Sequence, residues 1–125
     1  MNGYLLTAGL IASLPAFGHI VFGEKWFLAP MLASDFETIA KKQNQCVFHY
    51  LSVFMVLAAF VLVSAGAGLR VGVDLRGCIW LIAACYAGFA LVQIAVAATS
   101  TGVSRWRFFQ WPMFLAVAVL SWLGS

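Results

Sequence analysis

Two histidines, His19 and His49, are the residues of this sequence best suited to bind a metal or to transfer a proton. Imidazole is the commonest metal ligand in proteins, and its charge changes near neutral pH. Glu24 follows His19 by five residues and Cys46 precedes His49 by three residues, so a carboxylate and a thiol accompany the two rings. We therefore predict a metal site formed by His19, Glu24, His49 and Cys46, which would suit Zn or Fe, or a haem b bound by His19 and His49. A haem would imply a redox role.

The spacing of these residues does not by itself decide for a metal, because H-x-x-x-H, E-x-x-H and C-x-x-C are all absent from the sequence. Two other interpretations stay open. His19 and His49 could be packing residues whose hydrogen bonds tie two helices together, or they could contact a quinone or another small ligand. Whether the chain is an enzyme is left open at this point.

The composition requires a membrane environment. Of the 125 residues, 64% are hydrophobic and only 9% are charged, whereas soluble domains are about 45–50% apolar and about 25% charged. Four apolar stretches are long enough to be membrane spans. The predicted fold is an all-α membrane protein, a single domain over 1–125 with four transmembrane helices in an up-down-up-down bundle. The predicted helices cover about 4–22, 35–68, 78–98 and 108–123.

Local signals set the predicted helix ends. Gly23 fits a left-handed residue just after the end of the first helix. Ser34 followed by Glu37 has the spacing of a capping box, which predicts that the second helix begins near Asp35. Pro15 should kink or loosen the first helix. On that helix Ala8, Ala12 and Ala16 are spaced for close helix packing, and His19 shares their face.

Basic residues predict the orientation in the membrane. Five basic residues lie on the membrane side that holds the first and third loops, and two lie on the opposite side. This excess favours a cytoplasmic position for the first and third loops. The first group is Lys25, Lys41, Lys42, Arg105 and Arg107, and the second is Arg70 and Arg76. We expect a multi-pass protein of the bacterial inner (plasma) membrane with both termini in the periplasm. The net charge is only +3 and basic residues do not cluster with aromatic ones, so nucleic-acid binding is not expected.

Polar residues of the four predicted helices fall at one depth. His19, His49, Gln93 and Gln110 each lie within a few residues of the cytoplasmic end of a different helix, and at 1.5 Å per residue this places them in one shallow layer. Polar groups at membrane depth are often functional. Gln93 and Gln110 are more plausible as hydrogen-bond partners between helices than as ligands.

Two short stretches resemble a known family. "HIVFGE", with His19, Gly23 and Glu24, and "FHYLS", with His49 and Ser52, are similar to motifs of small, uncharacterised bacterial membrane proteins with four predicted helices. In that family the aromatic residue before the second histidine is usually tryptophan, whereas it is phenylalanine here. The resemblance covers the first half of the chain and extends to the second half only in hydropathy. It implies the four-helix fold, a bacterial inner membrane and a functional grouping of His19, Gly23, Glu24 and His49, but no activity.

Other functions remain as alternatives. The chain could be an accessory subunit of a larger membrane complex or a homo-oligomer, in addition to its contact with the lipid bilayer. It also has the size of small multidrug exporters. Those proteins couple transport to protons through a carboxylate inside a span. No Asp or Glu lies within the apolar spans predicted here, which cover about 4–22, 46–68, 78–98 and 108–123, so transport is the weaker alternative.

Overall fold

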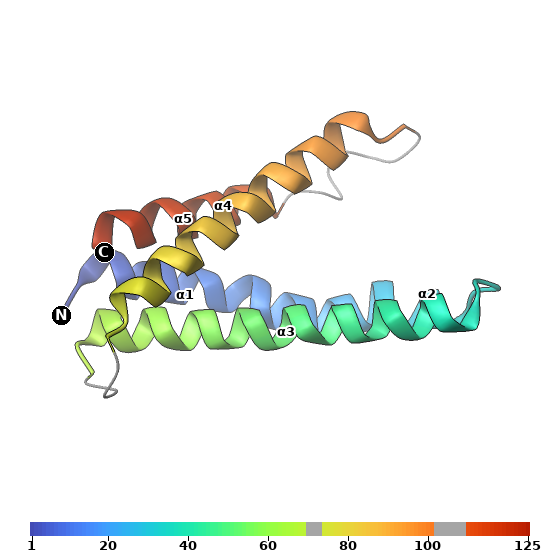
Figure 1. Cartoon of the computed structure of the whole chain (residues 1–125), viewed down its shortest axis with the longest axis horizontal. Helices are drawn as coiled ribbons and strands as arrows, with labels where there is room; N and C mark the ends of the chain where they lie inside the picture. Colours follow the sequence, from blue (N-terminus) through green and yellow to red (C-terminus); the bar gives the residue numbers. More distant parts are fainter. Residues whose placement is uncertain (70–73, 102–109) are drawn as a thin grey trace.

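The computed structural model describes residues 1–69, 74–101 and 110–125, and all of its regular elements are helical. Four helical segments fill this part of the chain, so the all-α prediction is confirmed (Figure 1). The elements are α1 (Gly3–Gly18), η1 (His19–Leu28), α2 (Ala29–Ala33), α3 (Thr38–Ala67), α4 (Arg76–Thr99) and α5 (Trp111–Gly124). Arg70, Arg105 and Arg107, and the first two residues of the predicted helix over 108–123, lie outside the described residues.

The first helical segment is longer than predicted. α1, η1 and α2 follow one another without a break from Gly3 to Ala33, and η1 is a π-helix, in which the Ala29 N–H donates to the Glu24 carbonyl five residues earlier. The prediction that Gly23 ends the helix is therefore wrong. Gly68 at the end of α3 is the one described residue with the positive φ of a left-handed cap, at 76°. The sharp turn after Ala33 reverses the chain into α3.

α3 begins at Thr38, and Glu37 rather than Ser34 is its N-cap. Both carboxylate oxygens of Glu37 accept backbone hydrogen bonds, from Ile39 at 3.0 Å and Ala40 at 2.8 Å, which satisfies amides that the first turn of a helix leaves unpaired. Ser34 instead donates its hydroxyl to the Met31 carbonyl at the end of α2. The capping-box interpretation was wrong, because the Ser34 hydroxyl bonds to a carbonyl of α2 and does not accept a hydrogen bond from the first turn of α3.

Removing the Glu37 side chain should loosen the first turn of α3. The two backbone hydrogen bonds lower the pKa of Glu37 below its ordinary value of 4.5, so the cap is fully formed above about pH 4.5 and is lost as the pH falls through the lower folded-state pKa. Hydrogen exchange at neutral pH should show faster exchange of the Ile39 and Ala40 amides in Glu37→Ala. Asp35→Ala, a change at an exposed acid that makes neither of these bonds, should leave both rates unchanged. Equal rates in Glu37→Ala and the unchanged protein would contradict the cap.

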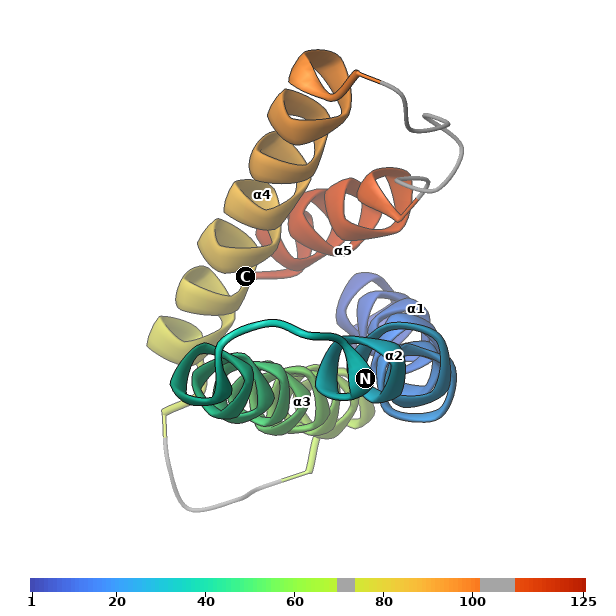
Figure 2. The same ribbon diagram turned by 90° about the vertical axis from the view of Figure 1, so that its right-hand side faces the viewer.

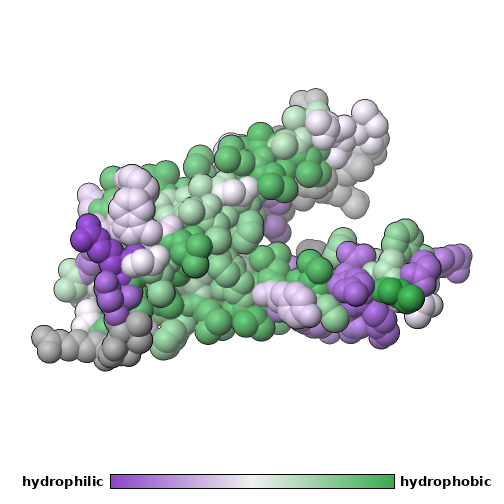
Figure 3. All heavy atoms as spheres, in the orientation of Figure 1, coloured by the Kyte–Doolittle hydropathy of each residue, from purple (hydrophilic) through white to green (hydrophobic). Residues whose placement is uncertain are grey.

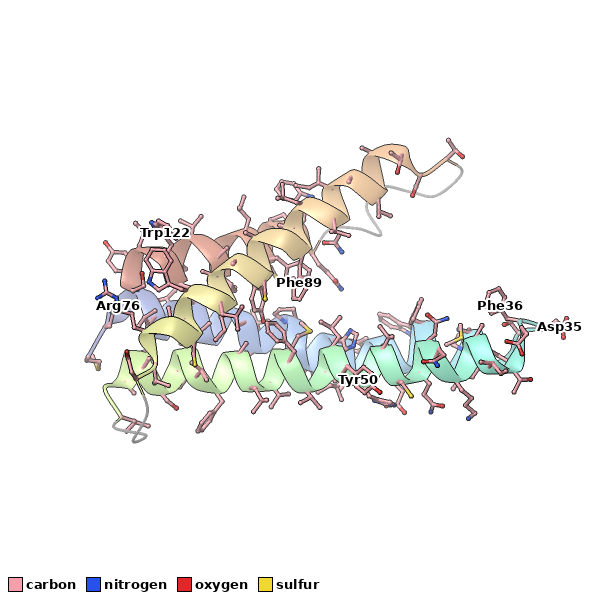
Figure 4. The ribbon with its side chains drawn as sticks, in the orientation of Figure 1. Asp35, Phe36, Tyr50, Arg76, Phe89 and Trp122 are labelled. Atoms are coloured by element: carbon pink, nitrogen blue, oxygen red, sulfur yellow. The ribbon has the colours of Figure 1, made fainter. Side chains whose placement is uncertain are left out.

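The helices form two pairs that meet along α1. α1 packs against α3 and α5, and α4 packs against α5 (Figure 2). Both termini lie at the same end of the molecule (Figure 1), where the Asn2 side chain donates to the Gly124 carbonyl at 2.8 Å. An aromatic cluster joins three helices in the core: Phe54 from α3, Tyr86 and Phe89 from α4, and Phe114 from α5. Figure 4 shows Phe89 pointing inward from α4.

Small residues bring α1 and α3 into close contact. Ala8, Ala12 and Ala16, the predicted small-residue stripe, are all buried. Two glycines bring the backbones even closer. A Cβ on Gly9 would lie 2.7 Å from the Val63 nitrogen, and a Cβ on Gly66 would lie 2.6 Å from the Leu6 Cα. The contact between α1 and α3 therefore requires glycine at both positions.

The outer surface is apolar in the middle and polar at the two ends. Three helical segments, Gly3–Ala33, Thr38–Ala67 and Arg76–Thr99, are long and apolar enough to cross a membrane, and α5 is a shorter apolar helix of 14 residues. Figure 3 shows hydrophobic residues over most of the visible face, with hydrophilic residues gathered towards its ends. Arg76 lies near one end, and Asp35 and Phe36 lie at the tip of the other (Figure 4). This distribution is compatible with a multi-pass membrane protein.

Candidate functional site: an aromatic cleft beside His19

A cleft of about 750 Å³ opens between the first helical segment and the α4–α5 pair. It exists because α4 diverges from α1 and α3 towards its C-terminal end (Figure 1), and Figure 3 shows the surface hollowed between the two arms. Its walls are mostly apolar and aromatic, and none of the Lys, Arg, Asp and Glu residues that the structure describes lines it. The lining residues are Leu14, Pro15, Gly18, His19, Phe22, Gly23, Trp26 and Phe27 from α1 and η1, Phe48 from α3, Gln93 from α4, and Gln110 and Met113 at the start of α5.

His19 is held in this cleft by Phe48. The Nε2 atom of His19 lies 3.1 Å from the Phe48 carbonyl oxygen, and the two rings stack with centroids 4.0 Å apart and planes 21° apart. The same carbonyl accepts the Ser52 hydroxyl at 3.0 Å. A hydrogen bond and a ring stack thus fix both the position and the orientation of the imidazole. The interpretation of His19 as a tie between the first two long helices agrees with this contact, and its partner is the Phe48 backbone.

Gly23 packs closely against the same arrangement. A Cβ at this position would lie 3.2 Å from two ring carbons of Phe48 and 3.8 Å from the Nδ1 atom of His19. Any side chain there would therefore press on the Phe48 ring and partly cover the imidazole. The structure therefore explains glycine at position 23 by its close contact with the Phe48 ring, and not by the helix cap that the sequence suggested.

Near-parallel rings line the cleft. Phe48 is stacked between His19 and Phe27, whose ring lies 6.2 Å from it at an interplanar angle of 16°. Phe22 and Trp26 form a second stack, with centroids 5.0 Å and planes 19° apart. Most of these rings come from the π-helix η1, and π-helical turns are found frequently at functional sites.

The remaining predicted ligands point elsewhere. His49 is exposed, meets Phe48 edge-on at 5.6 Å and does not line the cleft. Successive residues of a helix differ by about 100° in direction, so an inward Phe48 turns His49 outward. Cys46 is an exposed free thiol. Glu24 is exposed and lies beside Lys25 on a separate shallow surface of η1.

The structure thus does not bring His19, Glu24, Cys46 and His49 together. Within 1–69, 74–101 and 110–125, no group of three or more His, Cys, Asp or Glu side chains is placed to hold a metal ion. The metal or haem site stays a prediction, and this geometry gives it no support.

The predicted polar layer is present in part. His19, Gln93 and Gln110 line the same cleft, and only His49 lies outside it. The Gln93 Nε2 atom donates to the Gln110 Oε1 atom at 3.5 Å, a long bond that agrees with the expected contact between the helices. The Gln93 Oε1 atom is buried and has no partner in the described part of the chain. The sequence analysis did not find Phe22, Phe27, Phe48 and Met113 as site residues. The three phenylalanines lie within a concentration of aromatic residues around the two histidine motifs, whereas no such signal marks Met113.

No family model, curated protein or solved structure matches this chain. The resemblance of its two histidine motifs to a family of small bacterial membrane proteins therefore stays a prediction, and function has to be argued from the cleft.

Proposed function

We propose that this chain is a multi-pass protein of the bacterial inner membrane that binds a small, neutral, planar ring molecule of the quinone and hydroquinone class in the cleft beside His19. The helices would cross the membrane as an up-down-up-down bundle. The cleft would lie near the cytoplasmic face and the termini in the periplasm, as the excess of basic residues on one side favours. The first half of the chain would belong with the small bacterial membrane proteins whose motifs it resembles.

The observation that carries this proposal is the pair of ring stacks on the cleft wall. His19, Phe48 and Phe27 form one row of near-parallel rings, and Phe22 with Trp26 forms another. Aromatic rings favour offset stacking and edge-to-face contacts with a further ring, so such walls suit a flat ligand. The volume of about 750 Å³ falls within the range of small-molecule pockets, about 300–1,000 Å³.

The charge of the cleft limits the ligand class. Within the described residues, no Lys, Arg, Asp or Glu lines the cleft, so a phosphate or an ammonium headgroup would lose its water without gaining an ionic partner among them. A neutral molecule that is soluble in the membrane avoids this cost. Phe27 and Trp26 are 57% and 69% exposed, so the aromatic wall can be reached from outside the bundle.

Filling the cleft should weaken this binding. Gly18 lines the cleft, and a Cβ there would meet no atom within 4 Å, so Gly18→Leu adds a side chain to free space. The affinity of the detergent-purified protein for 1,4-naphthoquinone and its hydroquinone, measured by calorimetry, should fall by about tenfold or more, or about 1.4 kcal/mol.

Gly77→Leu is the matched control, because Gly77 is an exposed helical glycine outside the cleft with equal space around its Cβ. It should bind as the unchanged protein does. The proposal is rejected if neither form of the probe binds to the unchanged protein, or if Gly18→Leu binds as well as Gly77→Leu.

A further inference from the structure

We propose that the cleft selects a ligand that donates a hydrogen bond, such as a hydroquinone or a phenol, over the corresponding quinone or ether. This inference rests on the proposed function and specifies the ligand class for the same cleft. It follows from which atoms of His19 and Gln93 are already occupied.

The Phe48 carbonyl fixes the tautomer of His19. A carbonyl oxygen can only accept a hydrogen bond, so the Nε2 atom 3.1 Å away from it must carry the hydrogen. In the neutral ring the other nitrogen, Nδ1, then has a lone pair and no hydrogen. Nδ1 is an acceptor, and no hydrogen bond occupies it within the described ranges of the chain.

Glycine at position 23 leaves the approach to this acceptor open. The missing Cβ would have been 3.8 Å from Nδ1, and both His19 and Gly23 line the cleft. A hydroxyl group of a ring stacked in the cleft can therefore donate to Nδ1. A carbonyl group at the same place would bring two lone pairs together.

Gln93 adds a second acceptor on the α4 side of the cleft. Its Nε2 atom donates to Gln110, and its Oε1 atom is buried without a partner in the described part of the chain. A buried acceptor that stays unpaired costs stability, and a ligand hydroxyl that reached this atom would pair it. Within the described residues, the Nδ1 atom of His19 and the Oε1 atom of Gln93 are thus both acceptors without a hydrogen bond, so a ligand without an O–H group gains no hydrogen bond from either atom.

Two probes that cannot change redox state test this preference. 1-Naphthol and 1-methoxynaphthalene share one ring system, and only the first carries an O–H group. We expect the full chain in detergent to bind 1-naphthol about tenfold more tightly or better, since a site that pairs a ligand hydroxyl discriminates strongly against analogues without it. His19→Phe keeps an aromatic ring but removes Nδ1, so its preference for 1-naphthol should shrink severalfold, while His49→Phe should keep the full preference.

A spectroscopic measurement separates this inference from the proposed function. Nitrogen NMR of ¹⁵N-histidine-labelled His49→Gln protein reports His19 alone and should show a protonated Nε2, with Nδ1 unprotonated and shifted by 1-naphthol. Equal binding of the two probes, or a hydrogen on Nδ1 of the neutral ring, overturns the donor preference while leaving binding in the cleft intact. If the unchanged protein binds neither probe, both the preference and the proposed function fail.

Discussion

Replacing Gly66 by alanine is expected to lower the free energy of unfolding by about 1–3 kcal/mol, the usual cost of forcing an extra carbon into a packed contact. The new Cβ would lie 2.6 Å from the Leu6 Cα and 2.9 Å from the Leu5 carbonyl carbon. These are backbone atoms of α1, and a change of side-chain rotamer cannot relieve the overlap. α1 and α3 would have to move apart, which would also strain the hydrogen bond of 2.7 Å from the Asn2 N–H to the Gly66 carbonyl.

The matched control for this change is Gly88→Ala in α4. A Cβ on Gly88 would meet no atom within 4 Å, while the gain in helix propensity from glycine to alanine, about 1 kcal/mol, is the same at both positions. Unfolding in detergent with increasing denaturant, followed by circular dichroism, should therefore rank Gly88→Ala at or above the unchanged protein and Gly66→Ala well below it. Equal stability of the two variants would contradict the close packing of α1 on α3.

Replacing His19 by alanine is expected to weaken hydroquinone binding by about tenfold or more, whereas His49→Ala should leave the affinity unchanged. The first change removes both the Nδ1 acceptor and a ring of the stack with Phe48, and hydrogen bonds and aromatic contacts of this kind are each worth about 1 kcal/mol. The second change removes an exposed ring that does not line the cleft. Calorimetry with 1,4-naphthohydroquinone under reducing, oxygen-free conditions measures both affinities.

The same pair of variants separates the interpretations that the sequence left open. A metal or haem bound by both histidines predicts that either change abolishes binding of that cofactor. A purely structural His19 predicts that His19→Ala lowers stability and leaves hydroquinone affinity as it was. If the two variants lose hydroquinone affinity equally, or if neither does, then His19 is not the polar contact of a ligand site.

The four helices could be predicted from hydropathy, but several of their ends could not. Apolar runs locate the residues that avoid water, and these runs end where the polar surface begins. The first helical segment continues past Glu24 and Lys25 to Ala33, because the start of α3 returns alongside it and Lys41 donates to the Leu32 and Ser34 carbonyls at its end. These hydrogen bonds come from Lys41, which lies beyond the turn in the next helix. Cap signals near residue 23 therefore do not reveal them.

The inward face of α3 could have been identified from the sequence, and it would have excluded His49. Phe48, Met55 and Leu62 are spaced by seven residues and are all buried, as expected for one face of a packed helix. His49, one residue beyond Phe48, belongs to the neighbouring exposed face. His49 was predicted as a ligand because imidazole binds metals, although the spacing of the large apolar residues places Phe48, and not His49, on the inward face.

The cleft itself could not be predicted, because it depends on the direction of α4. Gln93 and Gln110 were expected to meet, and their hydrogen bond is present. The space in front of them exists because α4 leans away from η1 and α3 (Figure 1). The direction of α4 depends on its tertiary contacts, among them the rings of Phe54, Tyr86, Phe89 and Phe114, and no local sequence pattern reports it.

Photolabelling of the full chain in lipid nanodiscs with an azido-naphthoquinone, followed by mass spectrometry of the peptides, tests ligand binding in the cleft most directly. We expect the label to attach to the aromatic wall and to the start of α5, at Phe22, Trp26, Phe27 and Met113. An excess of 1,4-naphthohydroquinone should prevent this labelling. A label spread over exposed apolar residues outside the cleft, such as Leu10, Phe60 and Leu91, and unaffected by the competitor would contradict it.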